Sequence, residues 1–383
     1  MVRNIFALDF GTTKFCIAGY IPSKLGEPSL NIFSSPAEGM KRGMLSDIGK
    51  AESTLKLLIS KTQDSLGVKI KKISVGVAGH HLNSKIISVY QKFPTKNIDN
   101  RTLLELENDA LKVAESSGRE VLHLIPISYK VDDRAGLKNP IQMLSSSITG
   151  QYFVIDCDQL YLSELVSVCN SCGLEVSDLH AEPYASSLVT LPEKEKNMGI
   201  AIADIGGGTT DGIVFINGKP QSCFSINIGG HMMTNDISIG LNLPYTEAEK
   251  AKTFFGLSAT QSSQNISLKS LKNELISHEG KKVQRILAHR IVELSEHLAA
   301  HLAPFKGMLG AGLLLTGGGS GVISLNSFLS KQFGIPVEGI QPNVNKIPGL
   351  KQQLFASTFA TVIGLITLEV EKEIQKYPIT GPT

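Results

Sequence analysis

Two stretches far apart in the chain share one pattern of apolar and polar positions. Residues 4–10 and 199–205 are short apolar runs, and each leads through a polar, glycine-containing bend into a second apolar run, at 14–21 and 210–216. Two apolar runs joined by a short polar bend are typical of a β-hairpin. The two hairpins start about half of the 383-residue chain apart. Such self-similarity indicates a duplicated domain rather than a long array of repeats.

The remaining pattern predicts alternating helices and strands. Apolar residues at i, i+3 and i+4 predict amphipathic helices, and short continuous apolar runs predict strands of the buried kind. The polar stretch 192–197 predicts a linker, and the chain after Pro244 is predicted to be mainly helical. We expect helices at 50–66, 159–172, 283–302 and 355–370, and strands at 73–79 and 312–316.

The segment from about 82 to 158 has a different pattern of apolar and polar residues. A polar helix is predicted over about 100–116, and strand-like runs follow at 121–131 and 148–155. Loop signals around Lys138-Asn139-Pro140 separate these runs. We interpret this segment as an insertion with its own small sheet.

Composition narrows the classes of function. Hydrophobic residues make up 42% of the chain and charged residues 19%, which suits large buried cores. Lys and Arg number 37 against 35 Asp and Glu, a balance that argues against nucleic-acid binding, which needs a basic face. Five scattered cysteines make no regular disulfide frame, and the first residues carry no secretory signal. The apolar stretch 355–370 is too short to span a bilayer, so we expect a cytoplasmic protein.

The bends of the two hairpins contain the same types of residue. "ALDFGTTK" (7–14) and "ADIGGGTTDG" (203–212) each place an Asp before glycine and a Thr-Thr pair. Glycine lets the backbone come close to a ligand, and successive backbone N–H groups form concave anion sites. A carboxylate repels phosphate but suits hydrated Mg²⁺, which is held by one or two carboxylates and by phosphate oxygens. Asp9 and Asp204 are therefore predicted to hold Mg²⁺ through water.

Two such bends that face each other would clamp a polyphosphate from both sides. One bend alone is explained equally well as an ordinary turn, but two matching copies make that explanation the weaker one. The chain has no G-x-x-x-x-G-K-[ST], and its first bend lacks G-x-G-x-x-G, which argues against a P-loop and a dinucleotide site. A third cluster, "LLLTGGGSG" (313–321), predicts a strand, a turn and a helix start. Close approach to a base or ribose would explain its glycines, as would a simple helix-starting loop.

Five motifs in order resemble the ATP-site motifs of the actin, heat-shock chaperone and sugar-kinase superfamily. Within it, "GVAGHHL" (76–82), "VLHLIPISYKVDDRAGLKNP" (121–140) and "YFVI" (152–155) resemble the FtsA cell-division proteins. The resemblance implies an α/β, actin-like ATPase fold, with two duplicated ribonuclease-H-like domains around a nucleotide cleft and an FtsA-type inserted subdomain 1C. The five motifs are "LDFGTTK" (8–14), "EPYASSL" (182–188), "IADIGGGTTDG" (202–212), "IGG" (228–230) and "LLLTGGGSG" (313–321).

The same resemblance implies a division of the chain into four parts. Subdomain 1A would comprise 1–82 and 159–195, and the inserted subdomain 1C would comprise 83–158. Subdomain 2A would comprise 196–243 and 311–383, and subdomain 2B 244–310.

The resemblance also implies ATP and Mg²⁺ as ligands and assigns roles to matching positions. The predicted contacts are Asp9, Gly11, Thr12, Thr13 and Lys14 in the first phosphate hairpin; Asp204, Gly206, Gly207, Gly208, Thr209 and Thr210 in the second; Gly229 and Gly230 beside the nucleotide; Glu249 and Lys252 at the ribose and adenine; and Gly317, Gly318 and Gly319 in the adenosine turn.

Glu182 and Asp204 are the predicted catalytic residues. Glu182 matches an acid before Pro that orients the attacking water in many relatives, a reasonable task for a carboxylate. A helix cap explains it as well, because Pro183 is favoured in the first turn of a helix. The resemblance implies at most slow hydrolysis, with ATP acting chiefly as a switch that closes the cleft and favours polymer.

The partners implied by the family are the C-terminal tail of FtsZ, further copies of the chain in a protofilament, other divisome proteins and the inner face of the cell membrane at the division site. Arg290 aligns with a basic residue of the family's FtsZ-tail groove, although an exposed Arg on an amphipathic helix needs no partner. The last residues include Pro378, Gly381 and Pro382, which oppose an amphipathic membrane helix. Membrane attachment is therefore expected through a tail not present in this chain or through a partner.

Two other functions remain open at this point. A type IV pilus assembly adaptor of the PilM kind would have a similar fold. A small-molecule kinase of the actin fold would need a general base in the cleft, and Glu182 is the one candidate that the sequence offers.

Overall fold

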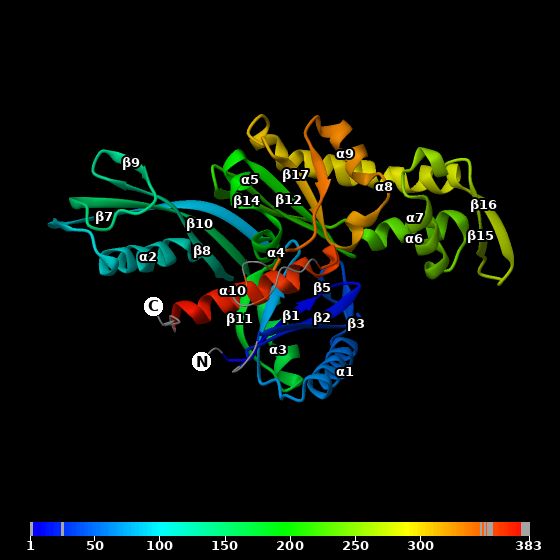
Figure 1. The fold of residues 1–383 in the computed structure, drawn as a ribbon, viewed down its shortest axis with the longest axis horizontal. Helices are drawn as coiled ribbons and strands as arrows, with labels where there is room; N and C mark the ends of the chain where they lie inside the picture. Colours follow the sequence, from blue (N-terminus) through cyan, green and yellow to red (C-terminus); the bar gives the residue numbers. More distant parts are fainter. Residues whose placement is uncertain (1–2, 24–26, 345–346, 348–349, 351–354, 377–383) are drawn as a thin grey trace.

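The structure is a computed structural model, and it describes residues 3–23, 27–344, 347, 350 and 355–376. Pro378, Gly381 and Pro382, on which the expectation about the tail rests, lie outside the described residues. Two sheets of five strands form the two halves of the molecule, and a smaller antiparallel sheet lies at one end of its long axis (Figure 1).

The first sheet has the order β11-β6-β1-β2-β3. Its strands are β1 (Ile5–Phe10), β2 (Lys14–Ile21), β3 (Ser29–Pro36), β6 (Lys72–Val77) and β11 (Glu175–Ala181). The predicted hairpin is confirmed, since β1 pairs antiparallel with β2 and Asp9 lies opposite Cys16. On its other side β1 pairs parallel with β6.

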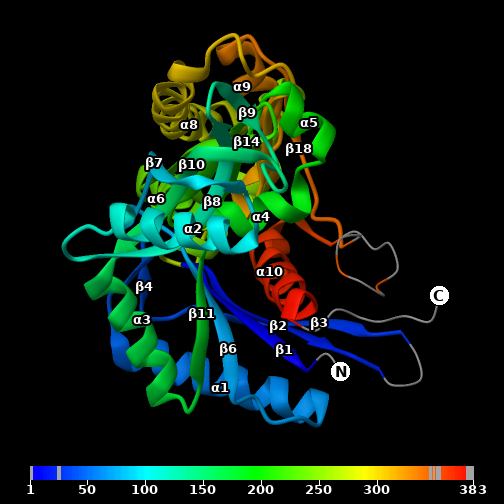
Figure 2. The ribbon, with the colours of Figure 1, turned by 90° about the vertical axis from the view of Figure 1, so that its left-hand side faces the viewer.

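Helices cover both faces of this sheet. Leu8 of β1 packs with Leu55 and Leu58 of α1 (Ile48–Leu66), and α3 (Gln159–Ser171) lies on the same face. The neighbouring Ala7 points the other way and joins the core around α10 (Ala360–Lys376) and α4 (Glu182–Thr190). Figure 2 shows α1 and α10 on opposite sides of β1 and β2. Successive side chains of β1 thus pack against helices on opposite faces of the sheet, as expected from the alternation of side chains along a strand.

The second sheet repeats the plan with the order β14-β13-β12-β17-β18. In it β12 pairs antiparallel with β13, and Asp204 lies opposite Asp211. The apolar stripe predicted from Val283 to Leu302 is confirmed as the buried face of α8 (Gly280–Leu302). The other elements are β12 (Ile200–Ile205), β13 (Thr210–Ile216), β14 (Lys219–Ile226), β17 (Gly312–Thr316), β18 (Val337–Gly339), α6 (Gly230–Leu241), α7 (Tyr245–Phe255) and α9 (Leu325–Phe333).

The insertion is an antiparallel sheet of four strands with a helix on one face. Its order is β7-β10-β8-β9, and Leu106 and Ala110 of the helix α2 pack into its core. It lies at one end of the molecule, while the hairpin of β15 (Asn265–Lys269) and β16 (Leu275–Glu279) lies at the other (Figure 1). The elements of the insertion are β7 (Leu82–Asn97), α2 (Asn100–Ala114), β8 (Arg119–Val131), β9 (Arg134–Leu137) and β10 (Leu144–Asp158).

The structure differs from the sequence prediction in three places. The predicted linker at 192–197 forms the short helix α5 (Glu193–Met198), because Glu193 and Glu195 in its first turn complement the helix dipole. The hairpin of β15 and β16, together with the small strands β4 (Met40–Lys41) and β5 (Met44–Leu45), has too little apolar patterning to be predicted. The subdomain assignment implied by the resemblance places residues 311–383 in subdomain 2A of the second half. In the structure, α10 packs on β1 and β2 of the first sheet.

Candidate functional site

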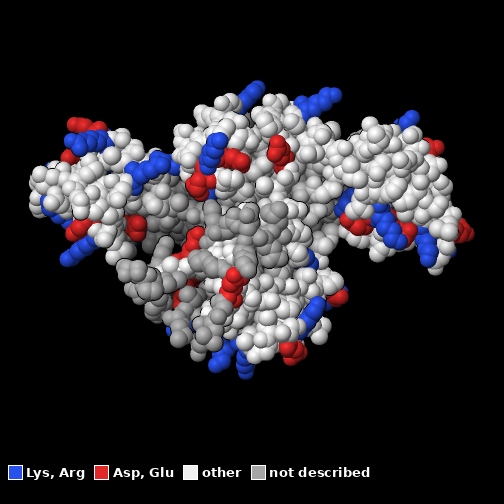
Figure 3. Space-filling view, in the orientation of Figure 1, with Lys and Arg blue, Asp and Glu red and all other residues white. Residues whose placement is uncertain are grey.

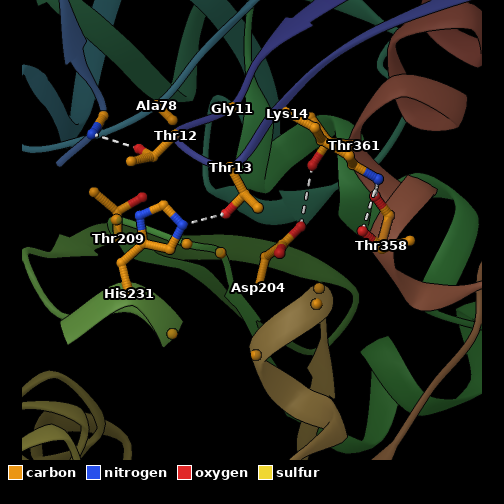
Figure 4. Close-up of a pocket in the computed structure, with 18 of the residues that line it drawn as sticks. Gly11, Thr12, Thr13, Lys14, Ala78, Asp204, Thr209, His231, Thr358 and Thr361 are labelled. Carbon is orange, nitrogen blue, oxygen red and sulfur yellow. Dashed lines mark hydrogen bonds between the residues drawn. The ribbon is translucent and has the colours of Figure 1, made fainter. Parts of the chain in front are cut away.

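The two hairpins meet at one cavity between the halves of the molecule. The bend after β1 supplies Gly11, Thr12 and Thr13, and the bend after β12 supplies Gly206, Gly207, Gly208 and Thr209. The cavity has a volume of about 340 Å³, and both Asp9 and Asp204 line it. Figure 4 shows Thr13 of the first bend and Asp204 of the second reaching toward the same space.

The glycines of the second bend let the two bends approach closely. A Cβ atom on Gly207 would lie 2.0 Å from Oγ1 of Thr13, and one on Gly208 would lie 2.4 Å from Oγ1 of Thr12. No side chain fits at these distances, so each threonine of the first bend lies directly on a glycine of the second. The two bends are therefore in direct contact, and residues of both line the cavity.

Four carboxylates, those of Asp9, Glu182, Asp204 and Asp211, surround the cavity, and burial raises the pKa of each. Burial raises the pKa of Asp9 to about 6, an effect that Lys14 opposes and Asp211 reinforces. Burial, followed by the charge of Asp211, raises the pKa of Asp204 to about 7. Burial and then the charges of the other three acids hold the pKa of Glu182 well above its usual range. An environment that disfavours several negative charges at once favours a cation.

Each of these acids is fixed by an element of the fold. Asp9 and Asp204 are the second-last residues of β1 and β12, and the hydroxyl of Thr361, at the start of α10, donates to Oδ2 of Asp204 at 3.1 Å. Glu182 is the first residue of α4, and its side chain lines the cavity. The N-cap of α4 is Ala181, without a side-chain hydrogen bond. The arrangement therefore differs from the helix cap that the sequence also allowed for Glu182.

Helices α6 and α7 form the wall next to the second bend. The ammonium group of Lys252 lies 2.7 Å from the carboxylate of Glu249 and donates to the carbonyl oxygen of Gly230 at 3.3 Å. His231 and Tyr245 complete this wall. These residues combine apolar ring surfaces with a paired charge, a common lining for a small-molecule site.

The third glycine cluster closes the cavity on the side of Asp204. Gly317 has a φ of +82°, and a Cβ atom there would lie 2.2 Å from Oδ1 of Asp204. Only glycine combines this backbone conformation with this contact. Gly318 and Gly319 also line the cavity and form the start of a short 3₁₀ turn.

Comparison with known proteins identifies the family. A model of "Cell division protein FtsA" matches residues 201–364, and a model of the "SHS2 domain inserted in FTSA" matches residues 79–155. The cell division protein FtsA of Buchnera aphidicola subsp. Baizongia pistaciae is 30% identical in a match that covers 95% of this chain and 90% of its own length. This chain belongs to the FtsA family of cell division proteins. FtsA of Escherichia coli K12 is 24% identical over 98% of this chain and 93% of its own length.

Solved structures of other proteins share the fold of this FtsA-family chain. A chain of a PilM–PilN type IV pilus biogenesis complex matches with a TM-score of 0.67 and 17% identity, over 96% of this chain and 99% of its own. MreB5 of Spiroplasma citri bound to ADP matches with a TM-score of 0.58 and 16% identity, over 98% and 99%. The actin-like fold with the inserted FtsA domain, predicted from the motifs, is confirmed. At these identities the structural likeness concerns the fold alone.

Two of the predicted nucleotide contacts, Thr210 and Gly229, do not line the cavity. The hydroxyl of Thr210 is buried and donates to the carbonyl oxygen of Ile228, and a Cβ atom on Gly229 would lie 2.6 Å from the carbonyl oxygen of Gly207. Both residues therefore shape the second bend from behind. Arg290 lies on α8, away from the cavity.

The guanidinium of Arg290 is engaged within the chain. Its Nε and Nη2 atoms donate to the carboxylate of Asp236 at 2.7 and 3.0 Å, and Nη1 donates to Glu293 at 2.5 Å. Its side chain is 19% exposed. Arg290 is thus not the exposed, unpartnered arginine that was the alternative interpretation of the sequence.

Sequence reasoning missed several residues of the FtsA-family site. Asp211 lies only seven positions after Asp204 and stands in the same motif, so its position was available from the sequence. His231 and Tyr245 carry no motif of their own, and Thr358 and Thr361 reach the cavity only because the C-terminal segment folds back onto the first sheet. Thr358 accepts from the ammonium group of Lys14 through both its carbonyl and its hydroxyl oxygen, each at 2.7 Å.

The described residues include neither a cluster of metal-ligating side chains nor a helix that could span a membrane. No three His, Cys, Asp or Glu side chains within the described part of the chain are grouped as ligands of one metal ion. No helix in that same part is long and apolar enough to cross a membrane. On the face shown in Figure 3, Lys and Arg are interspersed with Asp and Glu.

Proposed function

We propose that this FtsA-family chain binds Mg-ATP in the cavity between its halves and acts as the nucleotide-dependent link between FtsZ filaments and the inner face of the membrane at the division site. One observation carries the nucleotide site: two glycine bends from different halves converge on one cavity, each with an Asp beside it. The solved MreB5 structures of the same fold are bound to ADP and to AMPPNP, which supports an adenine nucleotide.

The residues present suit the ligand. The backbone amides of Gly11, Gly207 and Gly208, with the hydroxyls of Thr12 and Thr13, would bind the phosphates. The N–H of Gly206 and the hydroxyl of Thr209 donate within the bend, to the carbonyl oxygen of Thr209 and to the carboxylate of Asp211, and so support its shape. Asp9 and Asp204 would hold Mg²⁺ through its bound waters, and the cation would neutralise the crowded carboxylates. Glu249, Lys252 and the glycines 317–319 line the same cavity and would face the ribose and adenine.

The proposed hydrolysis is slow at most. Glu182 would position the attacking water, as its side chain lines the cavity beside both Asp residues. Burial raises its pKa well above the usual range. In the nucleotide-free protein burial thus disfavours its ionised form, and a protonated carboxyl group is no base. Bound Mg²⁺ supplies positive charge that would return these acids to their ionised form.

The proposed division role includes polymer formation and partner binding. ATP would close the two halves on each other and favour a protofilament of identical chains. The tail of FtsZ would bind near Arg290, where an acidic peptide would compete with Asp236 for the guanidinium. Other divisome proteins and the membrane complete the proposed set of partners, and the localisation would be cytoplasmic and peripheral to the membrane.

Titration calorimetry tests the nucleotide site. We expect the wild-type chain to bind ATP in the presence of Mg²⁺ and to bind it much more weakly in EDTA. Asp204→Ala should abolish measurable Mg-ATP binding, while Glu182→Gln should keep the affinity and slow ADP release. Full affinity in Asp204→Ala would contradict the site. A kinase function would instead show ADP release stimulated by an added sugar or other alcohol.

A further inference from the structure

His231 connects the two phosphate hairpins although it belongs to neither. It is the second residue of α6, and its backbone N–H donates to the carbonyl oxygen of Gly207 at 2.8 Å. Its ring reaches across the cavity, where Nε2 lies 3.1 Å from Oγ1 of Thr13. Figure 4 shows the imidazole directed at Thr13 with no other side chain between them. The residue is thus anchored on the second half and contacts the first.

Thr13 stands where the two hairpins come closest. A Cβ atom on Gly207 would lie 2.0 Å from its hydroxyl oxygen, so the hydroxyl has Gly207 on one side and the imidazole on another. The imidazole is itself held edge-on by Tyr245, with ring centroids 5.5 Å apart and an interplanar angle of 81°. His231, Thr13 and Tyr245 all line the cavity. The position of the hydroxyl is therefore set by contacts from both halves.

A threonine hydroxyl has one hydrogen to donate and two lone pairs that accept. If Nε2 of His231 is unprotonated, Thr13 donates its hydrogen to the ring and has only lone pairs left for the cavity. If Nε2 carries the hydrogen, the ring donates to Oγ1 and the O–H of Thr13 is left to donate into the cavity. Only the second arrangement suits an anionic phosphate.

We infer that His231 is a positioning residue of the proposed nucleotide site: it donates from Nε2 to Oγ1 of Thr13 and so directs the hydroxyl hydrogen of Thr13 toward a phosphate oxygen of the ligand. The inference rests on the proposed function. A side chain of the second half would then assist phosphate binding by the first hairpin. Phosphate binding by that hairpin would depend on closure of the cleft, because His231 reaches Thr13 only when the two halves are close.

The charges around the ring are consistent with this role. Burial, followed by the charge of Lys252, lowers the pKa of His231, and Glu249 opposes this. The acids Asp9, Asp204, Asp211 and Glu182 line the same cavity. Burial and the charge of Lys252 both favour the uncharged ring in the nucleotide-free protein, in which one of the two nitrogens carries a hydrogen and can donate it.

A double-mutant cycle on the full chain tests the inference, with Mg-ATP as the probe in titration calorimetry. His231→Leu removes the donor and should weaken binding about tenfold, the value of about one hydrogen bond near a charged ligand. His231→Gln keeps an N–H donor at a similar reach and should bind within about twofold of wild type. Thr13→Val should weaken binding about tenfold. The double variant His231→Leu/Thr13→Val should bind no more weakly than Thr13→Val alone, because both changes remove the same interaction.

Controls separate this role from a general loss of structure. Met232→Leu alters the next residue, which does not line the cavity, and should bind as wild type. Urea unfolding without nucleotide should give every variant a cooperative transition. Wild-type affinity in His231→Leu, or losses that multiply in the double variant, would overturn the inference and leave the proposed function intact. If the wild-type chain fails to bind Mg-ATP, the proposed function fails and this inference fails with it.

Discussion

The carboxylate of Asp211 accepts a hydrogen bond at 3.2 Å from the backbone N–H of Gly79, a residue 132 positions away in the sequence. Its other oxygen accepts from the hydroxyl of Thr209 at 2.6 Å. Gly79 stands at the point where the chain leaves β6 and enters the inserted sheet at Leu82. One side chain beside the second phosphate hairpin thus holds the entrance to the insertion.

Replacing Asp211 separates this contact from the charge of the cavity. Asp211→Ala leaves a buried N–H of Gly79 without a partner and should lower the free energy of unfolding by about 1–3 kcal/mol. Asp211→Asn keeps an acceptor for Gly79 and should lose less. Urea unfolding measures both, and amide hydrogen exchange should rise around residues 79–82 in the Ala variant. Equal stability of Asp211→Ala and wild type would show that the contact does not matter.

Gly207→Val tests the close approach of the two bends. A Cβ atom would lie 2.0 Å from Oγ1 of Thr13, so the bends must move apart and the anion site must open. We expect Mg-ATP affinity to fall at least about a hundredfold, as two or more phosphate contacts are lost. Gly321→Ala is the matched control, because a Cβ atom there has nothing within 4 Å and Gly321 does not line the cavity. Calorimetry that found both variants equal to wild type would refute the arrangement.

The raised pKa of Asp204 predicts a pH-dependent stability. The pKa of Asp204 is about 7 in the folded protein, against 3.8 for an aspartate in water. Between these values the folded state binds more protons than the unfolded state, so this residue lowers the free energy of unfolding as pH rises from about 4 to 7. Asp204→Asn should therefore be more stable than wild type at pH 8, by roughly 2–4 kcal/mol, and similar at pH 4.

Comparing the two proteins in urea at both pH values reports on Asp204 together with its effect on Glu182, whose pKa the charge of Asp204 helps to raise. The measurement is made without nucleotide and with EDTA, since Mg²⁺ would stabilise the ionised wild-type site. A difference that stayed constant with pH would contradict the shifted pKa.

Arg290 and Asp236 predict opposite effects on binding of the FtsZ tail. If an acidic tail peptide takes the place of Asp236, then Arg290→Ala should weaken binding about fivefold or more, and Asp236→Asn should strengthen it. Fluorescence anisotropy with a labelled tail peptide measures both, and added salt should reduce the differences. A peptide that binds equally well to Arg290→Ala would remove Arg290 from the proposed interface. Binding of a pilus-protein peptide in its place would favour the PilM-like alternative.

The sequence predicted those parts of the site that are local in the chain. Asp9 and Asp204 each stand within a few residues of their glycines, so the strand-bend-strand pattern was enough to predict both hairpins and their common cavity. His231 lines the cavity through the packing of α6, and Thr361 through that of α10, so no local pattern announces either residue. The packing of α10 on the first sheet likewise depends on the match between its apolar face and residues such as Ala7 and Ala18, which is a property of the folded chain.

Ser84 of β7 both donates to the carbonyl oxygen of Cys223 at 3.1 Å and accepts from its backbone N–H at 2.9 Å. Cys223 belongs to β14, the outermost strand of the second sheet. The insertion therefore covers part of an edge strand. Without it, unpaired backbone N–H and C=O groups of this edge would be exposed and could pair with another chain, which promotes aggregation. Deleting the inserted domain would expose the backbone of β14 around Cys223. Poor solubility of such a deletion variant would therefore say nothing about the domain's part in cell division.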